Sequence, residues 1–190
     1  MPSNAFTGHL IPLLTDAEDL EDAHTRLRTG TRGRQFRLAA LNRAAVVMCL
    51  AAWEAYVEEL VREALQALRP ADPPLGAWPM HNASVSRQLG RFNTPSAENV
   101  RQLLSDALGF PDIRPSWRWP YCTSAQASQR LTDALRLRHE VAHGVNPRPT
   151  VHNYYSSHLP DFFRRLARCT DAAVRNHLVV THGLVNPWPA

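Results

Sequence analysis

Residues 135–144, Leu-Arg-Leu-Arg-His-Glu-Val-Ala-His-Gly, hold two overlapping patterns that imply different chemistries. One is H-E-x-x-H, formed by His139, Glu140 and His143. On a helix, the two imidazoles of this pattern can hold a zinc ion, and the glutamate can activate water. The other pattern is R-x4-H, formed by Arg138 and His143. A fixed cation and a titratable imidazole are the groups that phosphodiester cleavage without a metal requires.

The zinc interpretation needs a third protein ligand and an open position for water. No glutamate follows Glu140, and Gly144 is expected to end the helix directly after the second histidine of the pattern. The remaining downstream candidates have no recognised ligand spacing, and we expect the histidines among them to lie on the surface: His152, His158, Asp161, Asp171, His177 and His182. We therefore keep a zinc hydrolase as the weaker alternative and predict no metal and no cofactor.

The composition is that of a globular domain. The chain has 190 residues, of which 44% are hydrophobic and 20% are charged. This length favours one domain over residues 1–190, with a core from about residue 10 to 180 and irregular termini. No apolar run approaches the roughly 18 residues of a membrane span, and no basic stretch precedes an apolar one at the N-terminus. The sequence therefore predicts a cytoplasmic protein that does not enter the membrane.

All 21 basic residues are arginines, and the net charge is +4. Arginine binds phosphates bidentately and stacks on bases, so RNA is an admissible partner. A codon bias that replaces lysine by arginine would give the same composition. The cysteines at positions 49, 122 and 169 are widely spaced, which favours reduced thiols over disulfides or a cysteine zinc site.

Apolar spacing of three and four residues predicts helices throughout, and no stretch alternates with period two. The fold class is therefore all-α. Thr94 with Pro95 gives the expected start of one helix, and Pro160 is a candidate break in the last one. The expected helices cover about residues 11–28, 35–68, 84–89, 94–108, 124–143 and the segment after 150.

The long helix expected at 35–68 has two unusual features. Its middle, residues 43–52, is apolar nearly all round, so it should be buried on every face, either in the core or against a second subunit. Glu54 stands between Trp53 and Tyr56, both expected in the core. An unpaired carboxylate is costly there, so we predict that Glu54 pairs with an arginine, and Arg138 is the candidate. Arg138 paired with Glu140 instead is the alternative.

An aromatic and arginine-rich loop is expected at residues 111–121. Trp117, Arg118 and Trp119 are the types that stack on single-stranded bases. We favour the interpretation in which the two tryptophans pack against the core and hold the loop there.

Three segments together carry a resemblance to a known family. Residues 138–144 resemble the R-(polar)-x3-H signature of the HEPN superfamily of α-helical ribonucleases. Residues 51–60, Ala-Ala-Trp-Glu-Ala-Tyr-Val-Glu-Glu-Leu, resemble the Trp-Glu-x-Tyr stretch of its RiboL-PSP-HEPN branch. Residues 92–100 resemble the middle of these domains, and the similarity extends over about residues 10 to 180. His139 departs from the branch, where asparagine is more common.

The resemblance implies a HEPN-like helical bundle and metal-independent endoribonuclease activity between two identical protomers. His143 would take the proton of a ribose 2′-OH, and Arg138 would neutralise charge on the phosphoryl oxygens. His139 would position the phosphate or protonate the leaving oxygen, and Glu54 and Glu140 would support the site. The resemblance also implies a toxin or phage-defence effector with an antitoxin or another defence protein as partner. A HEPN module that binds RNA, a nucleotide or a protein without catalysis is the alternative.

The helical spacing of the motif favours a homodimer. Residues five apart on an α-helix differ by about 140° in azimuth, so Arg138 and His143 do not share one narrow face. Two such helices that meet across a two-fold axis would bring two arginines and two histidines around one cleft.

Overall fold

The computed structural model describes residues 1–28, 36–71, 76–143 and 151–188, without the side chains of residues 36, 37, 143, 153 and 154. Within these ranges no strand occurs, and the only bridge joins Trp119 to Cys122. The all-α prediction is therefore confirmed. The elements are η1 (Ala5–Leu10), α1 (Ile11–Arg26), α2 (Phe36–Ala67), α3 (Ala77–Leu89), α4 (Ala97–Leu108), η2 (Arg114–Ser116), α5 (Ser124–His143) and α6 (Asn153–His182).

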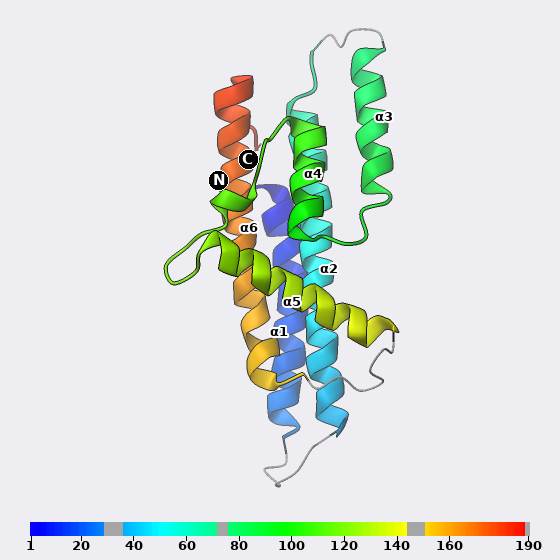
Figure 1. Ribbon diagram of the computed structural model, residues 1–190, viewed down its shortest axis with the longest axis vertical. Helices are drawn as coiled ribbons and strands as arrows, with labels where there is room; N and C mark the ends of the chain where they lie inside the picture. The colour runs from blue at the N-terminus through cyan, green and yellow to red at the C-terminus, as the bar shows by residue number, and fades with distance from the viewer. Residues whose placement is uncertain (29–35, 72–75, 144–150, 189–190) are drawn as a thin grey trace.

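Three long helices give the molecule its length. Figure 1 shows α1, α2 and α6 running close to the long axis, with α4 and α3 beside one half of α2. Helix α5 crosses in front of them obliquely. This crossing brings the C-terminal half of α5, which carries the motif, over the middle of α2. None of the helices in the described ranges combines the length and the apolar character that a membrane crossing requires.

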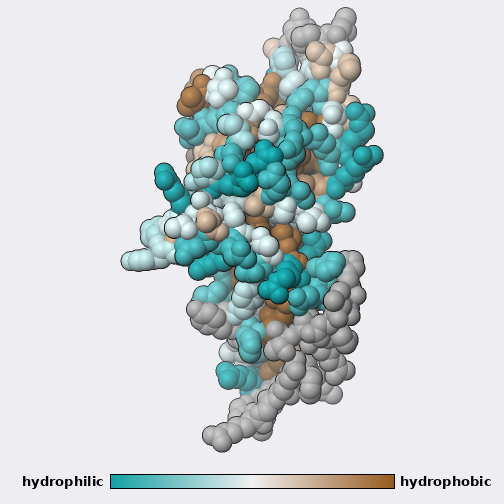
Figure 2. Space-filling model, viewed as in Figure 1, coloured by the Kyte–Doolittle hydropathy of each residue, from teal (hydrophilic) through white to brown (hydrophobic). Residues whose placement is uncertain are grey.

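Helix α2 is the central element, close to its predicted bounds. Its middle is buried on one side only, because Ala45, Val46, Cys49 and Leu50 are buried whereas Val47 is half-buried and Ala51 is exposed. The prediction of burial on every face is therefore wrong for the single chain. Apolar surface shows beside α5 where it crosses α2, on an otherwise largely hydrophilic face (Figure 2).

An aromatic cluster fixes α2 against its neighbours. Trp53 is fully buried, and its ring lies 5.5 Å from Tyr56 and 6.1 Å from both Trp117 and Phe163. Buried Trp and Tyr side chains usually find a hydrogen-bond partner for their N–H or O–H group. Trp53 Nε1 donates to Pro95 O at 3.0 Å, and Tyr56 Oη donates to Ala167 O at 3.0 Å. The predicted core positions of Trp53, Tyr56 and Trp117 are confirmed.

Helical structure begins earlier than the expected boundary near residue 10. Glu63 on α2 accepts the backbone N–H groups of Asn4 and Ala5, both at 3.0 Å, and so satisfies donors at the start of η1. The buried carboxylate of Asp171 on α6 accepts the Ser3 N–H at 3.2 Å and the Ser3 hydroxyl. These contacts join the N-terminus to the bundle, which hydrophobic spacing alone does not predict. At the other end Trp188 is also buried.

Two helix boundaries differ from the prediction. Helix α3 begins at Ala77, well before the expected residue 84. Pro79 does not prevent this early start, because it lies in the first turn, where a backbone N–H would have no partner within the helix. Helix α4 is capped by Ser96 and not by Thr94, since the Ser96 hydroxyl accepts the Asn99 N–H at 3.1 Å. Its other end is capped by Gly109 with a φ of 65°.

Helix α6 runs through Pro160 without the break that was expected. Leu159, Phe162 and Phe163 are all buried around the proline. Their packing holds this turn in place, which offsets the cost of about 3 kcal/mol that an interior proline carries.

The histidines outside the motif only partly follow the surface prediction. His152, His158 and His182 are exposed, as predicted. His177 is half-buried, and its Nε2 lies 3.0 Å from Leu108 O, with His182 Nε2 3.3 Å from the same oxygen. These two imidazoles therefore cap the carbonyl end of α4, a place that tertiary packing decides.

Candidate functional site

Arg138 is the residue around which a site assembles. It lies in the C-terminal half of α5, and its Nη1 donates to Glu54 Oε2 at 3.1 Å and to Asn93 O at 3.3 Å. Nε and Nη2 of Arg138 have no hydrogen-bond partner in the described part of the chain. The guanidinium is thus held on one side and keeps donors for an anion on the other.

The aromatic cluster positions both partners of Arg138. Trp53 immediately precedes Glu54 on α2, so its burial fixes the helical register that turns Glu54 toward α5. The Trp53 Nε1 bond to Pro95 O holds the segment that contains Asn93 against the same part of α2. The predicted pairing of Glu54 with Arg138 is confirmed, and the local fold explains its geometry.

The Glu54–Arg138 pair lies partly out of solvent, with side chains 21% and 32% exposed. Burial raises the pKa of Glu54 above its ordinary value, although the Arg138 charge and hydrogen bond act in the opposite direction. The carboxylate of Glu58, one turn along α2, raises the pKa further. Glu54 is therefore a carboxylate that depends on its arginine, as expected for a partly desolvated acid.

Glu140 does not join this pair, so the alternative pairing of Arg138 with Glu140 is wrong. It follows Arg138 by two residues, which is about 200° of rotation on a helix, and its Oε1 lies 3.4 Å from Arg136 Nη1. On that side a cavity of about 330 Å³ lies between α5 and the start of α6. Residues that line the cavity are Asp133, Arg136, Leu137, Glu140, Val151, His152 and Tyr155.

The two motif histidines are less completely described. His139 is exposed on α5. His143 is the last residue of α5, and its side chain lies outside the described residues, as does Gly144. Position 143 follows Arg136 by seven residues, so it lies within about 20° of Arg136 in azimuth and far from Arg138. The helix therefore places the two ends of the R-x4-H pattern on different faces.

A metal ion at the H-E-x-x-H pattern would need His139, His143 and a further ligand close together. Among the described side chains, no three His, Cys, Asp or Glu residues come together in a way that could hold a metal ion. His143 is not one of the described side chains, so the H-E-x-x-H pair itself is not tested and the zinc interpretation stays a prediction.

The structure adds one group that the sequence did not reveal. The carbonyl oxygen of Asn93 accepts a hydrogen bond from Arg138 across 45 residues of sequence. A backbone carbonyl carries no signal of residue type, so only the resemblance of segment 92–100 to known domains singled out this region.

The fold and the site together define the class of protein. The structure is an all-helical bundle in which a Trp-Glu pair on a long helix supports the arginine of an R-x4-H motif. The sequence profile of the RiboL-PSP-HEPN family matches residues 13–176. This match covers most of the chain, and the chain therefore belongs to the RiboL-PSP-HEPN family of HEPN domains. Comparison with curated proteins found no match, and neither did comparison with solved structures.

Proposed function

We propose that this HEPN domain is a metal-independent endoribonuclease. The observation that carries the proposal is the state of Arg138: Glu54 and the Asn93 carbonyl hold its Nη1, and among the described residues Nε and Nη2 have no hydrogen-bond partner. A guanidinium fixed in this way can stabilise the charge that develops on a phosphoryl group without reorganising. HEPN domains are frequently ribonucleases, which supports RNA as the substrate.

The proposed reaction needs one base and one anion-stabilising group. His143 accepts the proton of a ribose 2′-OH, and the resulting oxyanion attacks the adjacent phosphorus. The bond to the 5′ oxygen breaks, which leaves a 2′,3′-cyclic phosphate and, after protonation, a 5′-OH. Arg138 neutralises the non-bridging oxygens. His139, exposed on the same helix, orients the phosphate or protonates the leaving oxygen.

The proposed active form is a homodimer. Arg138 and position 143 lie on different faces of α5, so one helix does not bring both toward one phosphate. The half-buried and exposed apolar residues of α2, which include Val47, Met48 and Ala51, lie on a helix that α5 crosses and offer a surface for a second copy. An isologous contact there would bring two copies of α5 around one cleft. Glu140 contributes only through Arg136 in this arrangement.

The proposed biological role is that of a toxin or defence effector that acts on cellular RNA in the cytoplasm. Uncontrolled cleavage of RNA would harm the host, so an antitoxin or another defence-system protein is the expected partner. This role rests on the family alone.

The test is cleavage of total cellular RNA by the purified protein in excess EDTA. We expect the wild type to leave cyclic phosphate ends and Arg138→Ala and His143→Ala to lose cleavage by at least roughly 100-fold. Arg130→Ala is the matched control, because Arg130 is exposed on the same helix and outside the site. Folded wild-type protein that binds RNA without cutting it would favour the non-catalytic HEPN module. Cleavage only after zinc is added would favour the H-E-x-x-H chemistry.

A further inference from the structure

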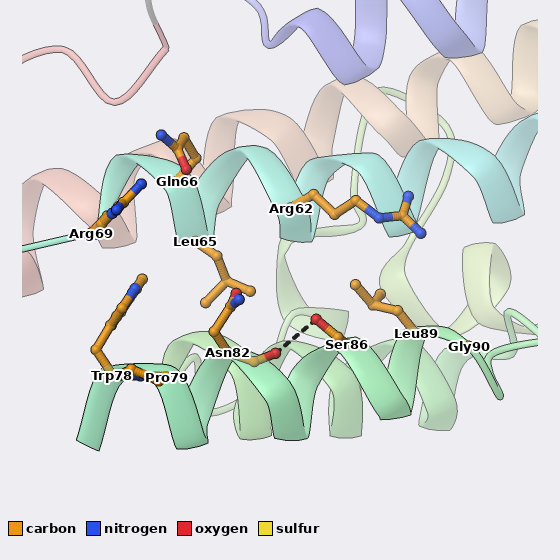
Figure 3. A pocket seen from close by; sticks show the side chains of 10 residues that line it. All are labelled: Arg62, Leu65, Gln66, Arg69, Trp78, Pro79, Asn82, Ser86, Leu89 and Gly90. Carbon is orange, nitrogen blue, oxygen red and sulfur yellow. Dashed lines mark hydrogen bonds between the residues drawn. The ribbon is translucent and has the colours of Figure 1, made fainter. Parts of the chain in front are cut away.

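A second concave surface lies away from the Glu54–Arg138 pair, between α2 and α3. We call it the α2–α3 groove and define it by Arg62 and Gln66 on α2, Arg69 just after the end of α2, and Trp78, Asn82 and Ser86 on α3. It has a volume of about 730 Å³. Figure 3 shows Arg69 and Trp78 facing one another at one end of the groove and Arg62 at the other end, near Leu89. The buried side chains of Leu65 and Leu89 supply its apolar floor.

The lining of the groove has a definite chemical character. Its described residues include two arginines, one tryptophan, two side-chain amides and a hydroxyl, and none of them is acidic. Arginines that follow a polyanion, together with an aromatic ring on which a base can stack, are the features of proteins that bind single-stranded nucleic acid. Amides such as Gln66 and Asn82 can donate to and accept from the edge of a stacked base.

The two arginines differ in how free they are. Arg62 is engaged by Glu58 at 2.8 Å and by Glu59 at 3.0 Å. Arg69 is exposed, and its side chain has no ionic partner in the described part of the chain. Arg69, opposite Trp78, is therefore the main phosphate contact, and Arg62 is a secondary one that stays partly neutralised.

The groove and the Glu54–Arg138 site share helix α2 and the segment that follows α3. Glu54 and the end of α2 at Ala67 lie about 20 Å apart along the helix axis, and Arg69 follows two residues later. The end of the groove at Gly90 leads directly into the segment whose Asn93 carbonyl contacts Arg138. A single strand would need several nucleotides to reach from one site to the other.

We infer that the α2–α3 groove binds the single-stranded RNA that flanks the cleaved phosphate, with a base stacked on Trp78 and a phosphate on Arg69. This inference rests on the proposed ribonuclease function and deepens it, because it defines the substrate as a single strand long enough to reach both the Arg138 site and the groove. It also predicts that short RNAs are poorer substrates, since they reach only the Arg138 end.

The experiment measures binding of labelled single-stranded RNAs of twelve and four nucleotides by anisotropy. His143→Ala protein is used throughout, so that the RNA stays intact while Arg138 can still bind its phosphate. We expect Trp78→Ala to weaken binding of the long RNA at least roughly tenfold, with Trp78→Phe restoring most of it. Arg69→Gln should weaken binding about fivefold and reduce the salt slope by about one. Binding of the short RNA should be unchanged by all three.

The control variant is Met80→Ala, because Met80 is 72% exposed on α3 and does not line the groove. Equal effects on long and short RNA, or no effect of Trp78→Ala in a protein with wild-type melting temperature, would overturn the inference. So would an acidic peptide that displaces the long RNA by binding the groove more tightly. If the wild type cuts RNA while the groove variants bind it normally, RNA binding by the groove is refuted and the ribonuclease function is retained. If the wild type cuts no RNA while substitutions of Trp78 and Arg69 still weaken binding, the ribonuclease function is refuted and RNA binding by the groove is retained.

Discussion

At the scale of single residues, the sequence predicted the contacts that follow from desolvation. A glutamate between two core aromatic residues needs a cation, and this reasoning identified the Glu54–Arg138 pair that the structure contains at 3.1 Å. The same reasoning could not find Asn93, because it contributes a backbone carbonyl. Glu140 pairs with Arg136 and not with Arg138, so its supporting role in the site stays a prediction.

The need for an arginine at position 138 can be separated from the need for a positive charge. Arg138→Lys keeps the charge but has a single nitrogen in place of three, so it cannot hold Glu54 and the Asn93 carbonyl while binding a phosphate through separate nitrogens. We expect cleavage to fall at least roughly tenfold, with stability changed by no more than about 1 kcal/mol. Arg130→Lys on the same helix should change neither quantity. Full activity of Arg138→Lys would mean that charge alone suffices.

The raised pKa of Glu54 predicts a pH dependence of stability. Because burial raises this pKa above its ordinary value of 4.5, the folded state binds a proton at a higher pH than the unfolded state does. The free energy of unfolding of the wild type, relative to that of Glu54→Gln, should therefore increase as the pH falls from the raised pKa to 4.5. It should decrease again as the pH rises through the same interval. Urea unfolding of both proteins between pH 7 and pH 4 measures the difference. A difference that decreases on acidification would show that Arg138, and not burial, dominates the pKa of Glu54.

At the scale of elements, sequence periodicity located the long helices but not the ends that tertiary contacts decide. The bounds of α2 and the start of α5 follow from apolar spacing and from Gly and Pro positions. The turn η1 does not, because carboxylates of Glu63 and Asp171, far away in sequence, satisfy its first donors. Pro160 was expected to break α6, yet packing on both sides of it keeps the helix continuous.

The start of α4 gives a prediction with a built-in control. The Ser96 hydroxyl accepts the Asn99 N–H, so Ser96→Ala should reduce the free energy of unfolding by about 1 kcal/mol. Thr94, the cap that the sequence suggested, contacts only its neighbour Asn93 through its hydroxyl, so Thr94→Ala should cost less than about 0.5 kcal/mol. Chemical denaturation of the two variants compares them directly. A larger loss for Thr94→Ala would mean that the helix begins at Thr94 in solution.

At the scale of the whole molecule, the arrangement of α5 makes the dimer a requirement of the proposed chemistry. Arg138 faces α2 and the segment at Asn93, whereas position 143 lies on the side of Arg136 and the cavity next to α6. Two chains can therefore bring Arg138 and His143 to the same phosphate more readily than one chain can. The half-buried and exposed apolar residues Val47, Met48 and Ala51 are the strip on α2 that the proposed contact would cover.

Complementation between two inactive variants tests this directly. If each site takes Arg138 from one protomer and His143 from its partner, a heterodimer of Arg138→Ala and His143→Ala retains one intact pair. Unfolding and refolding an equimolar mixture should then recover about a quarter of wild-type cleavage, because about half of the dimers are mixed and each has one of two sites. Each variant refolded alone should stay inactive, and light scattering should show the same dimer mass in every sample. Mixed dimers without activity would place both groups of each site in a single chain, and the strip on α2 would then need a different partner.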